Sequence, residues 1–128
     1  MKKLKIIAQV MKEEIGYSAV STVKNHFICS QADTYDELKV NFLEAVNLTF
    51  QDSFEYAPEE IIYEMDIASF FDSFPYLNVS ALADRIGINK SLLAQYANGS
   101  KKPAPKQAQR ILTGIQQLGN ELAAVRFS

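Results

Sequence analysis

Residues 78–99 constrain the fold of this chain more than any other stretch, because their spacing predicts two short helices joined by a tight turn. Ala83 is small where a second helix has to cross closely over the first. Gly87 follows four residues later, where a left-handed residue is favoured. The apolar positions that hold two helices at a steep angle are Leu82, Ile86, Ile88, Leu93 and Tyr96. This register indicates a helix-turn-helix, and an ordinary helical hairpin without a DNA-binding role is the alternative.

The second helix of this pair is the part that is expected to enter the major groove of DNA. Asn78 is a good N-cap for the first helix, Asn89 or Lys90 opens the second, and Asn98 with Gly99 ends it. Asparagine and glutamine make paired hydrogen bonds to adenine, whereas lysine favours guanine or phosphate. The predicted DNA-binding residues are Asn78, Ser80, Asn89, Lys90, Ser91, Gln95, Asn98, Lys101 and Lys102, with Lys106 as a further phosphate contact. Plain solubility is the other explanation for the lysines.

The charge is divided unevenly along the 128 residues. Residues 1–77 contain six Lys or Arg and thirteen Asp or Glu, whereas residues 78–128 contain seven Lys or Arg and two acidic residues. An acidic half and a basic half indicate two surfaces with different partners. The alternative is chance segregation of charge in two short segments.

The N-terminal half predicts a small antiparallel sheet with one packed helix, in the α+β class. Strands are expected at residues 3–11, 17–23, 27–30 and 61–67, with a tight hairpin turn at residues 24–25. Thr34 and Glu37 form a capping box, so a helix should begin there and end near Asp52. Its apolar stripe, which is wide enough to cover a small sheet, consists of Tyr35, Leu38, Phe42, Val46 and Phe50.

The C-terminal half predicts only helices. Residues 68–74 carry three phenylalanines and are expected to form the helix that closes the core of the unit, with a linker packed on that unit as the alternative. Pro105 suits the first turn of a final helix, and Gly114 and Gly119 either weaken that helix or permit close approach of another chain. Its long stripe, which favours dimerisation, consists of Ala108, Ile111, Leu112, Ile115, Leu118, Leu122 and Val125. We therefore expect two domains, residues 1–67 and residues 68–128.

Catalysis is not expected from the residue types present. His26 is the only histidine, Cys29 is the only cysteine, and neither a phosphate-binding glycine loop nor a metal-spaced Cys/His cluster occurs. A two-metal nuclease needs carboxylates that converge from strands, and the first strand has none between residues 4 and 11. We therefore predict a non-enzyme without a cofactor or a metal. The single cysteine and the absence of a secretory leader or an apolar run of membrane-spanning length predict a cytoplasmic protein.

Two segments of the chain resemble known families. Residues 82–112, LADRIGINKSLLAQYANGSKKPAPKQAQRIL, resemble the helix-turn-helix of phage-repressor-like regulators. The N-terminal half resembles the HicB antitoxins through residues 17–19 (YSA), residues 32–38 (ADTYDEL) and residues 41–48 (NFLEAVNL). The run before the helix, STVKNHFIC, lacks the proline and glycine that are common in HicB proteins, and Ala32 replaces the usual glycine.

The resemblance implies the antitoxin of a type II toxin–antitoxin system. Its N-terminal domain would be a partial, inactive RNase H-like fold that blocks a small basic HicA-type RNase, and its C-terminal domain would repress the operon as at least a dimer. Two other functions remain open. A transcription regulator would sense a small molecule in an apolar pocket of the N-terminal domain, and an RNase H-like nuclease would carry clustered carboxylates.

Overall fold

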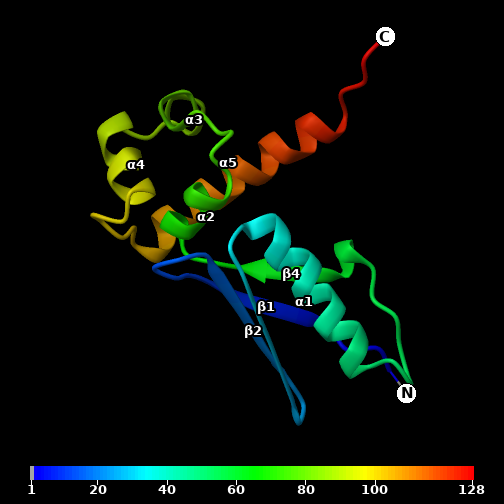
Figure 1. Ribbon diagram of the computed structural model, residues 1–128. Coiled ribbons are helices and arrows are strands. Elements are labelled where there is room, and N and C mark those ends of the chain that lie inside the picture. The colour runs from blue at the N-terminus through cyan, green and yellow to red at the C-terminus, as the bar shows by residue number, and fades with distance from the viewer. Residues whose placement is uncertain (1) are drawn as a thin grey trace. The chain divides into compact units, whose positions relative to one another are not determined.

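The computed structural model describes residues 2–128 and belongs to the mixed α+β class, with a four-stranded sheet followed by helices (Figure 1). The chain divides into two compact units, Met1–Ser69 and Phe70–Ser128. The first contains β1 (Ile6–Lys12), β2 (Tyr17–Val23), β3 (His26–Ala32), α1 (Tyr35–Thr49), the short 3-10 helix η1 (Pro58–Glu60) and β4 (Ile61–Glu64). The second contains α3 (Val79–Ile86), α4 (Lys90–Ala97) and α5 (Pro105–Ala123), and α2 (Ile67–Ser73) spans the division.

The sheet has the strand order β3-β2-β1-β4. The first three strands form an antiparallel meander, with a two-residue hairpin between Val23 and His26 as expected. The prediction of a purely antiparallel sheet is wrong, because β4 pairs in parallel with β1, from Ile6 opposite Ile61 to Gln9 opposite Glu64. The reason is topological: α1 carries the chain back along the sheet, so the strand that follows it runs in the same direction as β1.

The core of the first unit lies between the sheet and one face of α1. Thr34 caps the helix by accepting a hydrogen bond from the backbone N–H of Glu37 at 3.1 Å, as its position predicts. Ile6, Ala8 and Val10 of β1 point toward the helix and are buried. The fully or nearly fully buried helix residues are Tyr35, Leu38, Phe42 and Val46, which is the stripe read from the sequence.

Several predicted element bounds differ from those in the structure. Strand β1 spans Ile6–Lys12 instead of residues 3–11, and α2 spans Ile67–Ser73 instead of residues 68–74. Helix α1 ends at Thr49, three residues early, because the N–H of Phe50 closes the last turn onto Val46. Strand β3 extends from His26 to Ala32, beyond the predicted residues 27–30, because all seven of its residues pair with β2. Strand β4 ends at Glu64, and Ile67 begins α2 instead.

In the second unit, α3 and α4 pack on each other and α3 packs on α5. Leu82, Ala83, Leu93 and Ile111 are among the most buried side chains there, which agrees with the apolar register of residues 78–99. The ring of Phe70 contacts both Phe71 and Phe74, edge-to-face at a centroid distance of 5.1 Å and tilted at 5.0 Å, respectively. The expected helix at residues 68–74 is therefore present, and its aromatic residues form part of the packing.

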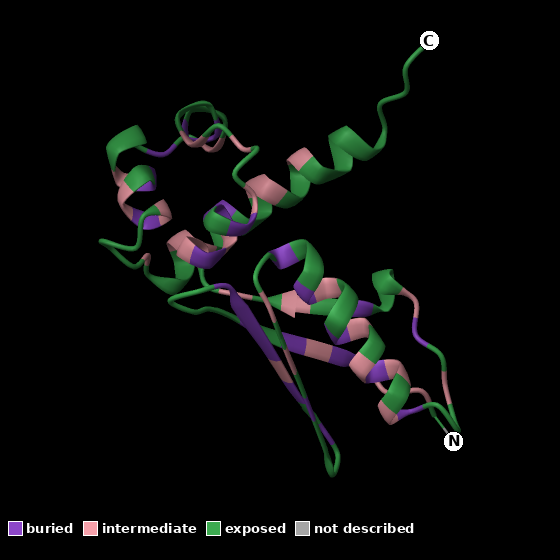
Figure 2. Cartoon of the chain, viewed as in Figure 1, coloured by how far each residue is buried: buried purple, intermediate pink, exposed green. Residues whose placement is uncertain are grey.

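Helix α5 is long for the unit that it supports. Its first half packs on α3, whereas its last turns extend beyond the other helices and are exposed (Figures 1 and 2). The interpretation of Gly114 as a contact for another chain is wrong, because an added Cβ there would lie 2.6 Å from Cγ1 of Ile86 on α3. Gly114 is therefore a close contact within the chain, whereas Gly119 faces open space.

Candidate nucleic-acid interface

The turn between α3 and α4 is fixed by backbone hydrogen bonds around one glycine. Gly87 has a φ of 85°, and its N–H and that of Ile88 both reach the carbonyl of Ala83, at 2.8 and 2.9 Å. This left-handed residue ends α3, so only Gly87, Ile88 and Asn89 separate the two helices.

Arg110 of α5 also holds this turn, a role that the sequence reasoning missed. Its guanidinium donates hydrogen bonds to the carbonyl oxygens of Ile86, at 3.3 Å, and Gly87, at 3.0 Å. These are the carbonyl groups that the end of a helix leaves unpaired. No local pattern indicates the contact, because Arg110 lies more than twenty residues away along the chain.

Two of the predicted DNA-binding residues are helix caps. The side-chain oxygen of Asn78 accepts the backbone N–H of Ala81 at 3.0 Å, and that of Asn89 accepts the N–H of Leu92 at 3.1 Å. Each side-chain oxygen is therefore engaged, and only the amide NH2 of each asparagine is left to meet a ligand. Ser80, on the first turn of α3, is exposed.

Asn98 is similarly engaged in the loop after α4. Its side-chain oxygen accepts hydrogen bonds from the backbone N–H of Ser100 at 2.9 Å and from the Ser100 hydroxyl at 2.6 Å. Gly99 follows with a φ of 82°, so the helix ends as the sequence predicts. This arrangement presents Lys101 and Lys102 from an ordered turn, because the N–H of Lys101 also bonds to the carbonyl of Gln95 at 3.2 Å.

The outward face of α4 is centred on Ala94, which the sequence reasoning did not include. Lys90, Ser91 and Asn98 are three or four residues from Ala94, so they share its face, and all four residues are exposed. Gln95 is half-buried at the rim of this face, and its side chain makes no hydrogen bond within the described residues. Ala94 could have been identified from the sequence, because it lies at helical spacing from the predicted DNA-binding residues Lys90, Ser91 and Asn98.

Several basic side chains around this face carry uncompensated charge. Lys101, Lys102 and Lys106 are exposed and form no ion pair within residues 2–128. Lys90 is partly neutralised by Asp84, with Nζ 3.2 Å from Oδ2, and Arg85 pairs with Glu121. The three unpaired lysines are therefore available for a polyanion.

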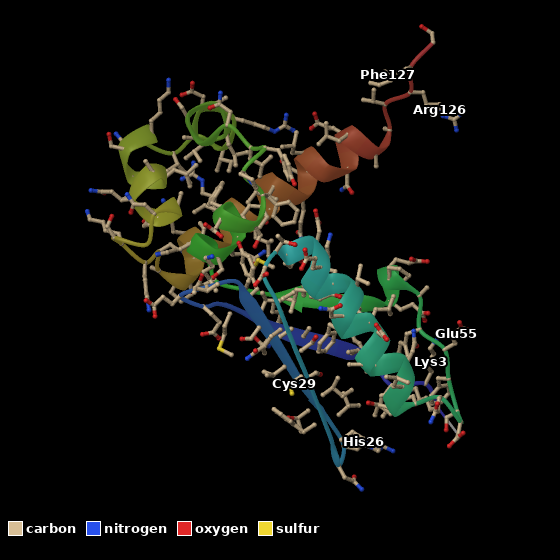
Figure 3. All side chains as sticks on the ribbon, viewed as in Figure 1. Lys3, His26, Cys29, Glu55, Arg126 and Phe127 are labelled. Carbon is tan, nitrogen blue, oxygen red and sulfur yellow. The ribbon has the colours of Figure 1, made fainter. Side chains whose placement is uncertain are left out.

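The first unit offers few functional candidates. Within the described part of the chain, no group of three or more His, Cys, Asp or Glu side chains is placed to hold a metal ion. His26 is exposed at the β2–β3 hairpin and packs edge-on against Phe50, with ring centroids 5.3 Å apart (Figure 3). An open hollow of about 580 Å³ lies over β1 and β2, and its lining includes Lys5, Ile7, Gln9, Val20 and Glu64.

Three ionisable groups of the first unit have shifted pKa values. Burial, and to a lesser extent Tyr63 and Asp36, raises the pKa of Tyr35 to about 12. Burial likewise raises the pKa of Tyr63. The backbone N–H of Ala57 and then the hydrogen bond from Lys3 hold the pKa of Glu60 below its usual value. Each shift follows from packing or capping, and none of these groups converges with another on a reactive position.

Comparison of the chain with protein-family models, with curated proteins and with solved structures gave no match. None of the described helices is both long enough and apolar enough to cross a membrane.

Proposed function

We propose that this protein is the antitoxin of a type II toxin–antitoxin system, which neutralises a HicA-type mRNA-cleaving toxin and represses its own operon by binding operator DNA. It acts without catalysis and without a cofactor, in the cytoplasm. The proposal assigns DNA binding to the second unit and toxin binding to the first.

One observation carries the DNA-binding part. Helices α3 and α4, joined by the three-residue turn at Gly87, present an exposed polar helix face that is followed directly by the unpaired Lys101 and Lys102. We assign these two helices as a helix-turn-helix, with α4 in the major groove. Ala94 contacts base edges or a thymine methyl group from the centre of the face, and Gln95 and Ser91 flank it. Lys101, Lys102 and Lys106 bind backbone phosphates without reading sequence.

The toxin-binding part is supported by charge and by element order. The first unit contains twelve Asp or Glu and six Lys or Arg. Its order of three strands, one helix and a fourth strand is the order on which the resemblance to HicB depends. An acidic surface is suited to a small basic RNase. We propose that the unit is a partial RNase H-like fold that lost its metal chemistry.

A single helix-turn-helix recognises only half of an operator, so repression requires at least two copies of the chain. The end of α5 supports such a contact in the second unit. Ile111 is buried and Ile115 is half-buried, and Leu118 and Leu122 continue the same three–four spacing to the end of the helix; Val125 follows just after α5 ends at Ala123. Leu122 is 62% exposed and Val125 is 59% exposed.

The test uses operator DNA taken from upstream of the gene. Lys101→Ala should weaken binding to operator and to unrelated DNA about equally, and should reduce the slope of log K against log salt by about 1. Gln95→Ala should weaken binding to the operator more than to unrelated DNA, by about 1–3 kcal/mol. The assignment of α4 as the reader is wrong if both variants bind operator as the wild type does, as measured by fluorescence anisotropy.

The antitoxin assignment has a separate test in the neighbouring reading frame. A small basic protein encoded there should arrest growth when expressed alone, and co-expression of this chain should restore growth. If no such protein exists and the chain protects against no candidate toxin, the assignment is wrong whatever the outcome of the DNA experiments.

The hollow over β1 and β2 favours one second candidate, a transcription regulator that senses a small molecule. It is lined by apolar Ile7 and Val20 together with charged Lys5 and Glu64. In that case a ligand would change operator affinity and no basic protein would co-purify. Val20→Trp, which fills the hollow, would then abolish the ligand response and leave operator binding intact.

A further inference from the structure

Strand β3 lies at one end of the sheet and presents an unprotected edge. It is seven residues long, pairs with β2 throughout without a bulge, and contains neither a charged residue nor a proline. Proteins commonly protect such edges with lysine, proline, bulges or very short strands. Strand β4, at the other end, has only four residues and carries Glu64. The two edges therefore differ, and only β3 is suited to pairing with another strand.

The side chains of β3 also differ between its two faces. Ile28 is buried and faces α1, whereas Phe27 and Cys29, its neighbours along the strand, are exposed on the opposite face. Figure 3 labels Cys29 on this strand. Phe27 is 67% exposed. A neighbouring strand would cover part of this apolar surface while it satisfies the backbone groups of the edge that α1 leaves unpaired; the carbonyl of Gln31 already accepts a hydrogen bond from Asn41.

Helix α1 contributes a second layer along the same edge. It packs mainly over β3 and β2, and the side-chain amide of Asn41 donates to the carbonyl of Gln31 at 3.3 Å, which places Asn41 on the β3 side. Ala45 and Leu48 follow Asn41 at helical spacing and share that side. Leu48 is 61% exposed. The side of α1 above the edge thus presents Asn41, Ala45 and Leu48 where a second helix would approach, and the exposed Glu37 and Glu44 flank them at the same helical spacing.

The spacing of the two layers is compatible with a second copy of this chain. Strands in a sheet lie about 4.8 Å apart, so a helix centred between β2 and β3 would lie about 10 Å from its two-fold copy across a β3–β3 junction. Packed helices prefer axial distances of about 8–10 Å. Strands and helices would therefore come into contact in the same arrangement.

The area is sufficient for an interface of modest size. A seven-residue strand is about 24 Å long, and the sheet with its helix is about 20 Å thick, which gives about 480 Å² per copy and about 1,000 Å² in total. That total is at the lower limit for a specific protein–protein interface.

We propose that β3 pairs antiparallel with β3 of a second copy, which extends the sheet to eight strands with both α1 helices on one face. Overlap of all seven residues places the two-fold axis at Cys29, the central residue of His26–Ala32. Residues opposite each other in an antiparallel pair have Cα atoms about 4.5–5.5 Å apart. That separation lies within the range that a disulfide spans, so Cys29 reports directly on the pairing.

The first test is oxidative cross-linking of the full-length protein. The wild type should form a covalent dimer through Cys29 with diamide, at least about tenfold faster than Cys29→Ser/Gln31→Cys, whose two thiols would be about 14 Å apart along the strands. Cys29→Ser/Phe27→Cys/Gln31→Cys should cross-link rapidly again, because residue 27 of one copy faces residue 31 of the other. If the wild type is no faster than the single-thiol control, the proposal is wrong.

The second test measures mass by light scattering at about 100 µM protein. Leu122→Asp removes the separate contact assigned to α5, and this variant should remain dimeric through β3. Adding Cys29→Lys should make it monomeric, because a lysine at an edge opposes strand addition, whereas adding Gln116→Lys, also at an exposed site, should not. The proposal is contradicted if Leu122→Asp is already monomeric, or if its dimer persists with Cys29→Lys.

Discussion

The two glycines of α5 show how a single residue type can have opposite effects within one helix. An added Cβ at Gly114 would lie 2.6 Å from the Ile86 side chain, whereas nothing lies within 4 Å of the same position at Gly119. Alanine favours a helix over glycine by about 1 kcal/mol, and overpacking costs about 1–3 kcal/mol. The sign of each substitution therefore depends on the surroundings of the glycine.

We expect Gly119→Ala to stabilise the helical unit by about 0.5–1 kcal/mol and Gly114→Ala to destabilise it by about 1 kcal/mol. Chemical denaturation followed by circular dichroism at 222 nm measures both. Each variant serves as the control for the other, and a shift in the same direction would contradict the packing of α5 on α3.

Tyr35 gives the first unit a predicted pH dependence. Its pKa is raised to about 12, so between pH 10 and pH 12 the folded state holds a proton that the unfolded state has released. The stabilising contribution is complete below pH 10 and is lost as the pH rises through the folded value.

The free energy of unfolding should consequently fall above pH 10 by at most about 1.4 kcal/mol per pH unit for this group. In Tyr35→Phe the fall should be shallower, while Tyr76→Phe, at an exposed position, should match the wild type. Absorbance at 295 nm should show Tyr35 and Tyr63 titrating late, because burial raises the pKa of both, and Tyr35→Phe should remove one of these two late transitions. A wild-type slope retained in Tyr35→Phe would show that other groups cause it.

At the scale of elements, α4 is the helix whose exposed face is expected to determine DNA affinity. Ala94 is at the centre of that face, and its replacement does not disturb the core of Leu93 and Tyr96. We expect Ala94→Glu to reduce DNA affinity at least about tenfold, through steric bulk and charge repulsion from phosphates. Gln116→Glu, which adds the same charge at an exposed site on α5, should reduce it much less. Equal losses in the two variants would mean that net charge alone matters.

The elements also show which structural features can be predicted from local sequence and which cannot. The caps at Thr34, Asn78 and Asn89 were predicted from the sequence because each depends on a hydrogen bond between residues three positions apart. The direction of β4 was not predicted, because its pairing with β1 joins residues more than fifty positions apart. Arg110 at the Gly87 turn was missed for the same reason.

At the scale of the whole molecule, the apolar end of α5 predicts that operator binding depends on association between copies. Leu122→Asp should leave each helix-turn-helix folded but remove the contact that holds the two of them at a fixed spacing, so affinity for an operator with two half-sites should fall towards that for a single half-site. Thr113→Asp, at an exposed position outside the stripe, is the matched control. Titration of an operator with one or two half-sites measures the loss. If Leu122→Asp binds both operators like the wild type, α5 does not join the readers.

The sequence by itself determined where α1, α3 and α4 begin, which face of each is apolar, and how charge is divided, because these properties depend on neighbouring residues. Only the tertiary structure decided that β4 runs parallel to β1, that Gly114 meets Ile86, and that β3 lies at one end of the sheet. These outcomes depend on which distant segments meet, and burial against a distant segment is not encoded in local spacing. The polar face of α4 depends on both kinds of information. The spacing of its exposed residues can be read from the local sequence, but the turn that precedes α4 is held by Arg110 of α5, which is distant in the sequence.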